Sequence, residues 1–261
     1  MSVINFLARI GAATRGQLTA MGFAFRLFVR LWVSSVQALK RFDLVRDQVH
    51  FLGNHSLSII TVSGLFVGFV LGLQGYYTLQ RYGSSEALGL LVALSLVREL
   101  GPVVTALLFA GRAGTALTAG IGLMRAGEQL VAMEIMAVDP IQRILAPRFI
   151  GGFIAMPLFA AVFSAVGIAG GWLVCVVMIG IDPGSFWSQM QGGVDVWADI
   201  GNGVIKSVVF GIAVTFMAVL QGYSASPTPE GVSRATTRMV VVASLMVLGL
   251  DFLLTALMFS I

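Results

Sequence analysis

Charged residues are scarce in this sequence. Asp, Glu, Lys and Arg make up 11% of the 261 residues, whereas 57% are hydrophobic. Soluble domains contain about 25% charged residues. The balance excludes an ordinary soluble domain and predicts an integral membrane protein. The uncharged stretches have the length of membrane helices, and they lack the ten-residue alternating pattern of an outer-membrane barrel, so the protein is expected to be helical.

Cysteine and the common catalytic motifs are also lacking. The single cysteine, Cys175, excludes an intrachain disulfide and a thiol metal site. The sequence contains no HExxH, no GxSxG and no Walker motif. We therefore expect no catalytic residues, no metal site and no P-loop nucleotide site in this chain, and nothing indicates a nucleic-acid partner. Energy for any transport must come from a partner subunit or an ion gradient.

Five uncharged windows are long enough to cross a bilayer as helices: 56–79, 86–120, 149–180, 203–222 and 239–260. Residues 1–50 mix Arg and Lys with Phe, Leu and Trp, as an amphipathic segment in the membrane interface does. The predicted organisation is an interfacial region, 1–50, followed by an all-α membrane domain, 51–261. Within the first span, Gly64, Gly68 and Gly72 line one helix face, which favours close helix packing.

Basic residues are distributed unevenly between the connections. Lys and Arg number seven in 1–50, three in 121–148 and two in 223–238, whereas 180–202 contains three Asp and neither Lys nor Arg. The positive-inside rule places the three basic segments in the cytoplasm. The acidic loop 180–202 then lies on the outer side of the membrane, with a cytoplasmic N-terminus and a C-terminus on the outer side, which would be the periplasm in a Gram-negative inner membrane.

The connection 121–148 contains a candidate helix, "EQLVAMEIMAVDP". Leu130, Met133 and Met136 recur at helical spacing, and the helix is expected to stop at Asp139-Pro140. It can be a docking element for a partner or a helix that lies flat on lipid. Both interpretations stay open.

Two adjacent charges interrupt the second span in "LSLVRELGPVV". Neighbouring helical residues are about 100° apart around the axis, so Arg98 and Glu99 cannot face the same partner. Pro102 removes a backbone hydrogen bond to the carbonyl of residue 98, and Gly101 loosens the same turn. The charges are therefore predicted to lie at a helix irregularity.

Charges inside membrane spans normally face a partner or a cavity. Helix depth predicts that four of them meet in the outer half of the membrane: Arg98, Glu99, Lys206 and Asp251. Such a group can line a substrate path or act as a salt-bridged pin between helices.

Three long segments resemble the MlaE family of ABC transporter permeases: "GLFVGFVLGLQGY" at 64–76, "LVALSLVRELGPVVTALLFAGRAGTALTAGIGLMRAGEQLVAMEIMAVDP" at 91–140, and the segment 233–259. The resemblance implies a homodimeric permease in a Gram-negative inner membrane. It implies work with the cytoplasmic ATPase MlaF, its companion MlaB and the periplasmic MCE protein MlaD. The implied cargo is phospholipid, moved between the inner and outer membranes to maintain lipid asymmetry, with ATP and Mg bound only by the partner ATPase.

The resemblance also implies roles for individual residues. The lipid pocket would lie at the dimer interface toward the periplasm, lined by Leu71, Leu79, Tyr82, Arg98, Glu99 and Leu100. The helix in 121–148 would be the coupling helix that contacts the ATPase through Glu128, Gln129, Met133, Glu134 and Met136. Residues 1–50 would contain an elbow helix. An ion-coupled secondary carrier and a structural anchor for a periplasmic lipid-binding ring stay as alternatives.

Overall fold

The computed structural model describes residues 3–39 and 41–259, and the described part of the chain is almost entirely helical. The helices are interrupted by short 3-10 (η1) and π-helical (η2 to η6) segments. The elements are α1 (Val3–Leu39), α2 (Phe42–Arg81), η1 (Ser85–Ala87), α3 (Leu88–Leu94), η2 (Ser95–Leu100), α4 (Gly101–Phe109), η3 (Ala110–Gly114), α5 (Thr115–Ala126), α6 (Gln129–Ile135), η4 (Ile141–Leu145), α7 (Ala146–Trp172), η5 (Leu173–Met178), α8 (Pro183–Gly193), η6 (Val196–Ile200), α9 (Gly201–Tyr223) and α10 (Pro229–Phe259).

Five helical stretches are long and apolar enough to cross a membrane, as the sequence predicts. They are Ser56–Arg81, Ser85–Ala126, Ile141–Met178, Val196–Tyr223 and Pro229–Met258. All five stretches are longer than predicted, because the predicted windows exclude charged residues near their ends that the helices include. Backbone hydrogen bonding continues past a charged residue wherever water or lipid head groups can solvate its side chain.

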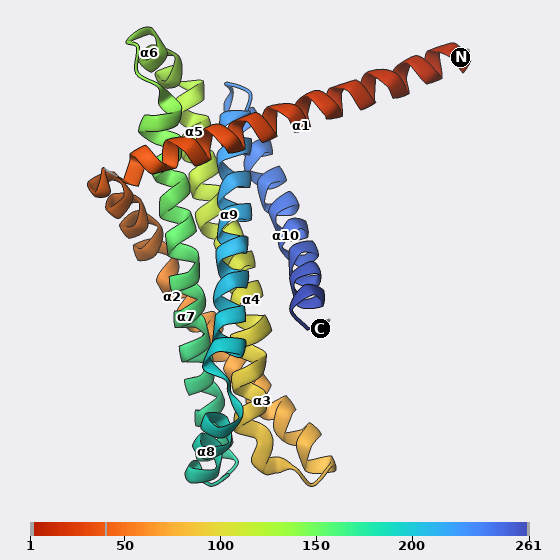
Figure 1. The fold of residues 1–261 in the computed structure, drawn as a ribbon, viewed down its shortest axis with the longest axis vertical. Coiled ribbons are helices and arrows are strands. Elements are labelled where there is room, and N and C mark those ends of the chain that lie inside the picture. The colour runs from red at the N-terminus through yellow and green to blue at the C-terminus, as the bar shows by residue number, and fades with distance from the viewer. Residues whose placement is uncertain (1–2, 40, 260–261) are drawn as a thin grey trace.

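The N-terminal helix α1 crosses the end of the bundle at which α6 also lies, and its N-terminal part projects away from the other helices (Figure 1). Its buried Leu27 and Leu31 share a hydrophobic cluster with Phe149 of α7 and Val219 of α9. The helix break falls just before Phe42. Residues 42–50, which the sequence grouped with the interfacial region, therefore form the first turns of α2.

Glycines allow α2 and α7 to pack with their backbones in close approach. A Cβ atom at Gly68 would lie 2.0 Å from the carbonyl oxygen of Gly167, and one at Gly64 would lie 2.9 Å from that of Phe163. Any side chain at these positions would push the helices apart. The structure thus confirms that this glycine face serves helix packing.

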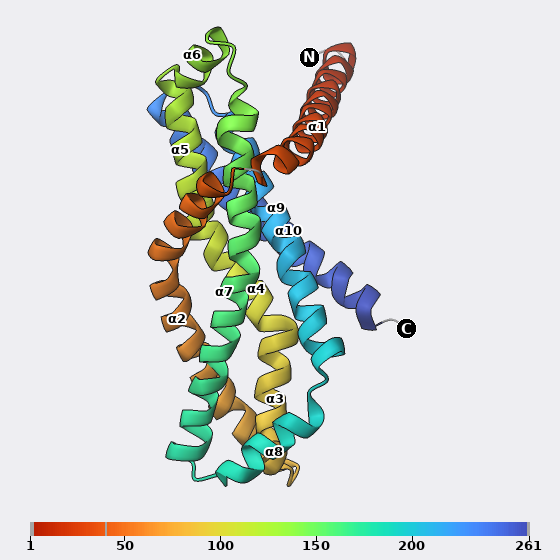
Figure 2. The same cartoon turned by 60° about the vertical axis from the view of Figure 1, so that its left-hand side comes forward.

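The bundle is long, with α6 at one end and α8 at the other (Figures 1 and 2). The basic connection 121–148 and the acidic loop 180–202 therefore lie at opposite ends. Helix α9 packs against α4, α5, α7 and α10, whereas α10 leans away from the bundle toward its C-terminus (Figure 2). In their most apolar windows, 61% of α9 residues are buried but only 11% of α10 residues. An apolar face of α10 is consequently uncovered, including Leu245, Phe252 and Leu257.

Candidate functional site

The two adjacent charges of the second span lie on η2, a π-helical turn. The backbone N–H of Gly101 donates to the carbonyl of Leu96, five residues back, and Pro102 follows without an N–H. Ser164 of α7 also donates to the Leu96 carbonyl, at 3.3 Å. This second bond to the same carbonyl attaches α7 to the irregular turn. The predicted irregularity is present and takes the form of a widened turn.

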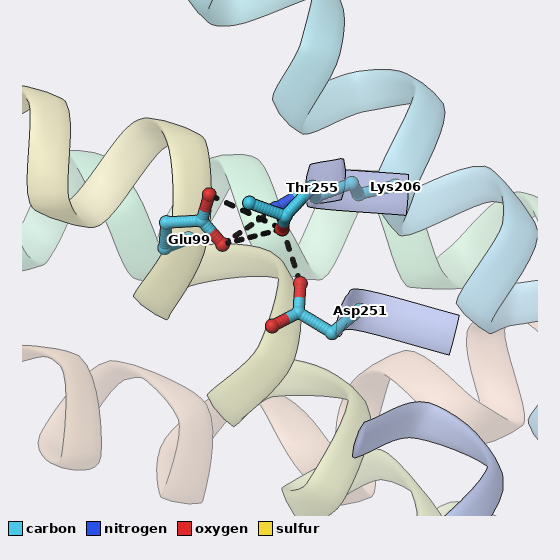
Figure 3. A network of polar contacts seen from close by, with 4 residues as sticks. All are labelled: Glu99, Lys206, Asp251 and Thr255. Carbon is cyan, nitrogen blue, oxygen red and sulfur yellow. Dashed lines mark hydrogen bonds and ion pairs between the residues drawn. The ribbon is translucent and has the colours of Figure 1, made fainter. Parts of the chain in front are cut away.

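Glu99 belongs to a group centred on Lys206 (Figure 3). The Lys206 Nζ atom lies 2.5 Å from a carboxylate oxygen of Glu99 and 3.1 Å from one of Asp251, and it donates to the Thr255 hydroxyl at 2.7 Å. The Lys206 side chain is fully buried, whereas those of Glu99 and Asp251 are 36% and 23% exposed. Residues from η2, α9 and α10 are thereby joined, with one cation between two carboxylates that are open on one side.

Arg98 points to a different partner, Asp199. The Arg98 Nε donates to an Asp199 carboxylate oxygen at 2.6 Å, and the Asp199 side chain is only 1% exposed. The other oxygen of Asp199 accepts the backbone N–H of Asp195 at 2.8 Å. The arginine is thereby fastened to the start of the fourth span.

Three of the four charges expected to meet, Glu99, Lys206 and Asp251, form one group, whereas Arg98 pairs with Asp199, which is not one of the four. The uncharged window of the fourth span begins at residue 203, so the sequence predicts that Asp199 lies in the outer loop. The structure continues α9 back through η6, about two helical turns before Lys206, so Asp199 and Lys206 both face η2. Asp199 and Lys206 are seven residues apart, about two helical turns, so they share one helix face if the helix extends back to Asp199. This spacing is the sequence feature that could have indicated the role of Asp199.

The turn that positions Asp199 is capped by Asp195, outside the spans. Its carboxylate accepts the backbone N–H groups of Trp197 and Ala198 at 2.8 and 2.9 Å. These bonds, led by that of Ala198, lower the pKa of the Asp195 carboxyl. The cap keeps the η6 turn, and with it Asp199, folded against the bundle.

The other predicted lipid-contacting residues differ in their burial. Leu71, Leu79 and Leu100 are half-buried and pack against the main hydrophobic core. Tyr82 is 79% exposed, at the C-terminal end of α2.

A feature that the sequence did not reveal is an apolar cavity of about 250 Å³ beside the Arg98–Asp199 pair. Val97, Pro102 and Ser164 line one part of it, and Ile200, Gly203 and Val204 line another. The cavity lies between α4, α7 and α9, and Pro102 and Gly203 are among the residues that line it. Such packing gaps depend on tertiary contacts, and no local sequence signal marks them.

Helix α6 lies at the opposite end of the bundle from α8, between two turns with left-handed backbone at Glu128 and Ala137. Leu130 is buried and Met133 is half-buried, whereas Val131, Ile135 and Met136 are 53%, 81% and 67% exposed. Among its predicted contact residues, Glu128, Gln129, Glu134 and Met136 are exposed. The outward apolar surface therefore includes Val131 and Ile135, which the methionine pattern did not indicate, because Met133 turns partly toward the protein.

The chain is similar to known membrane permeases along nearly its whole length. The family model described as "Permease MlaE" matches residues 45–257. The chain is 56% identical over 259 residues to the "Intermembrane phospholipid transport system permease protein MlaE" of Haemophilus influenzae, covering 99% of each chain. It is 31% identical over 260 residues to a probable ABC transporter permease protein of Rickettsia typhi, covering 99% of this chain and 100% of the relative. A probable ABC transporter permease protein of a Synechocystis strain is 34% identical over 214 residues, 82% of this chain and 81% of the relative.

Proposed function

The chain belongs to the MlaE permease family, and from this premise we propose that it is the membrane-spanning subunit of an ABC transporter that moves phospholipid between the inner and outer membranes of a Gram-negative cell. In this proposal it is a multi-pass inner-membrane protein that maintains the lipid asymmetry of the outer membrane. The name of the Haemophilus influenzae relative supports the cargo, because that protein is named for intermembrane phospholipid transport.

The observation that carries the proposal is the partly open group around Lys206. A fully buried lysine holds two carboxylates that are 36% and 23% exposed, next to the uncovered apolar face of α10. A phospholipid needs both surfaces, because its head group requires polar contacts and its acyl chains require apolar walls. Charges within a membrane span mark substrate paths by default.

In the proposed site, the acyl chains lie against Leu71, Leu79, Leu100 and Tyr82, and the head group lies near Arg98 and Glu99. Part of the Arg98 guanidinium is bound to Asp199, but 32% of its side chain stays exposed and can approach a lipid phosphate. A second copy of the chain, arranged as a homodimer, would cover the apolar face of α10 and close the pocket.

Helix α6 supports the proposed coupling to an ATPase. Its exposed Val131, Ile135 and Met136 form an adaptable apolar knob at one end of the bundle. We propose that this apolar surface binds in a groove of a cytoplasmic ATPase of the MlaF type, which is accompanied by MlaB. The polar Glu128, Gln129 and Glu134 lie beside this surface, and Met133 lies partly behind it. A periplasmic ring of the MlaD type would lie at the α8 end. ATP and Mg would then bind to the ATPase alone.

The test is lipid transfer by the complex reconstituted in vesicles, with fluorescent phospholipid and ATP. We expect transfer that requires the ATPase subunit and falls at least tenfold in Glu99→Ala. Lipid extracted from the purified complex and identified by mass spectrometry should decrease in Arg98→Ala. Transfer driven by an ion gradient without the ATPase would identify a secondary carrier. Unchanged transfer in both variants would identify a structural anchor.

A further inference from the structure

A second charged site lies far from Arg98, near the start of α7. The guanidinium of Arg148 is enclosed between α2, α5 and α7, where its Nη2 atom contacts the sulfur of Met124 at 3.6 Å. Its Nη1 atom is buried and has no hydrogen-bond partner among the described residues. No carboxylate of the described residues forms an ion pair with it. Since thioether sulfur is a weak acceptor, this cation lacks the anion that its burial requires.

Two cavities meet at the Arg148 side chain. The first, about 160 Å³, is lined by Asp47, Gln48 and Arg143 and by the apolar side chains of Leu44, Met124, Ile144 and Pro147. The second, about 140 Å³, is lined by Gln48 and by the apolar set Phe51, Ala116, Leu117 and Gly120. Arg148 lines both. Its guanidinium therefore lies between a cavity that other charged side chains also line and a cavity whose remaining lining is largely apolar.

The charged residues that line the first cavity favour an anion. Arg143 and Arg148 supply two positive charges, and Asp47 supplies one negative charge that is already paired with Arg46 at 3.5 Å. A guanidinium with a free N–H matches the oxygens of a phosphate group.

The apolar cavity indicates what the phosphate is attached to. Phe51 is 47% exposed and Leu123 is 60% exposed at the surface of α2 and α5. Each cavity is smaller than the roughly 300 Å³ of a pocket that encloses a whole ligand. Together they fit a phosphate and the first carbons of one acyl chain, while the rest of the lipid stays in the bilayer.

The site is separate from the one around Arg98. Arg148 precedes Ser164, which contacts the η2 turn, by sixteen residues of α7, a distance of about 24 Å along the helix. Arg148 belongs to the first turn of α7, and α7 begins at the α6 end of the bundle (Figures 1 and 2). We propose that Arg148 binds the phosphate of a phospholipid from the leaflet at the α6 end, with one acyl chain in the cavity beside Ala116. The proposal requires only that the chain spans a membrane, and it does not depend on lipid transport.

The experiment uses the full complex in nanodiscs that contain phosphatidylglycerol with a photoreactive group in its acyl chain. Cross-linked peptides are mapped by mass spectrometry. We expect label in 44–51 and 116–124 in the unmodified protein, and at least about a tenfold decrease in Arg148→Met, the loss expected for one charge-assisted hydrogen bond. The matched control is Arg234→Met, an arginine that is 79% exposed and paired with Glu230. Its label should not change.

Two further measurements test the proposed lipid site independently of how much Arg148→Met protein is recovered. Ala116→Leu fills the apolar cavity and should also reduce the label, while leaving Arg148 intact. In lipid-free detergent, added phosphatidylglycerol should raise the melting temperature of the unmodified protein but not that of Arg148→Met, and this comparison stands even if the variant is less abundant.

Undiminished label in Arg148→Met would overturn the proposal. The assignment to lipid would be overturned if inorganic phosphate removed the label and Ala116→Leu were still fully labelled. Those two results together would show a simple anion site. Arg98→Ala should keep the label at 44–51, so a failure of the proposed transport function is distinguishable from a failure here.

Discussion

Two ion groups begin on adjacent residues of one helical turn, and they differ in closure and in charge. The Arg98–Asp199 pair is neutral, and its carboxylate is 1% exposed and also bound to a backbone N–H. The Lys206 group has one cation and two carboxylates, and both carboxylates are partly exposed. The first group fastens the start of the fourth span to η2. The second connects three helices and leaves negative charge open beside an uncovered apolar face.

The comparison shows that neighbouring charges in a membrane helix can have separate purposes. Side chains about 100° apart around the axis reach different neighbours, so a closed structural pair and an open polar surface can share a turn. Substitution of the buried Asp199 should therefore change stability, whereas substitutions of the partly exposed Arg98 and of the open group should also change the proposed lipid site.

The largest effect is expected from Lys206→Met. Without the ammonium group, Glu99 and Asp251 face each other unpaired at membrane depth, and the free energy of unfolding should fall by about 3–5 kcal/mol. The measurement is the denaturation midpoint in detergent. Adding Glu99→Gln and Asp251→Asn to the same variant should restore most of the loss. A triple variant as unstable as the single one would contradict the proposed cause.

Gly203→Ala should disturb both groups at once. A Cβ atom at Gly203 would lie 2.2 Å from the backbone oxygen of Val97, on the turn that contributes Arg98 and Glu99. Helix α9 would have to move away from η2, at a cost of about 3 kcal/mol. The matched control is Gly201→Ala, because a Cβ there meets nothing within 4 Å. Equal stability of the two variants would refute a shared support for the two ion groups.

Asp199→Asn tests the closed pair alone. The amide oxygen can still accept the backbone N–H of Asp195, but the ion pair with Arg98 is lost, which should cost about 2 kcal/mol. Stability should fall while the lipid that copurifies with the complex, measured by mass spectrometry, changes little. A selective loss of lipid at normal stability would instead place Asp199 in the lipid site.

The smallest effect is expected from Thr255→Val, which removes the hydroxyl that accepts from Lys206 at 2.7 Å. The volume is kept and Lys206 retains two carboxylates, so the loss should be about 1 kcal/mol. A double-mutant cycle with Glu99→Gln measures the coupling between the two positions. A coupling of zero would show that the hydroxyl acts independently of the ion group.

Much of the candidate site can be predicted from the sequence. The buried charges stand out in uncharged spans, and the Gly-Pro pair after Glu99 predicts the irregular turn that the structure shows as η2. Which cation pairs with which carboxylate cannot be predicted from the sequence. Arg98 contacts a residue 101 positions away, and Asp199 looked like a loop residue because nothing local indicates that η6 folds back into the bundle.

The sequence by itself determined that the protein is helical, that it has five membrane spans and that Gly64, Gly68 and Gly72 pack a helix, because hydropathy and helical spacing are local properties. Only the tertiary structure decided which carboxylate belongs to which cation, where cavities remain, and that no carboxylate of the described residues pairs with Arg148. These depend on how α2, α5, α7 and α9 meet, since burial and the distance between charges are set by contacts between segments remote in the chain.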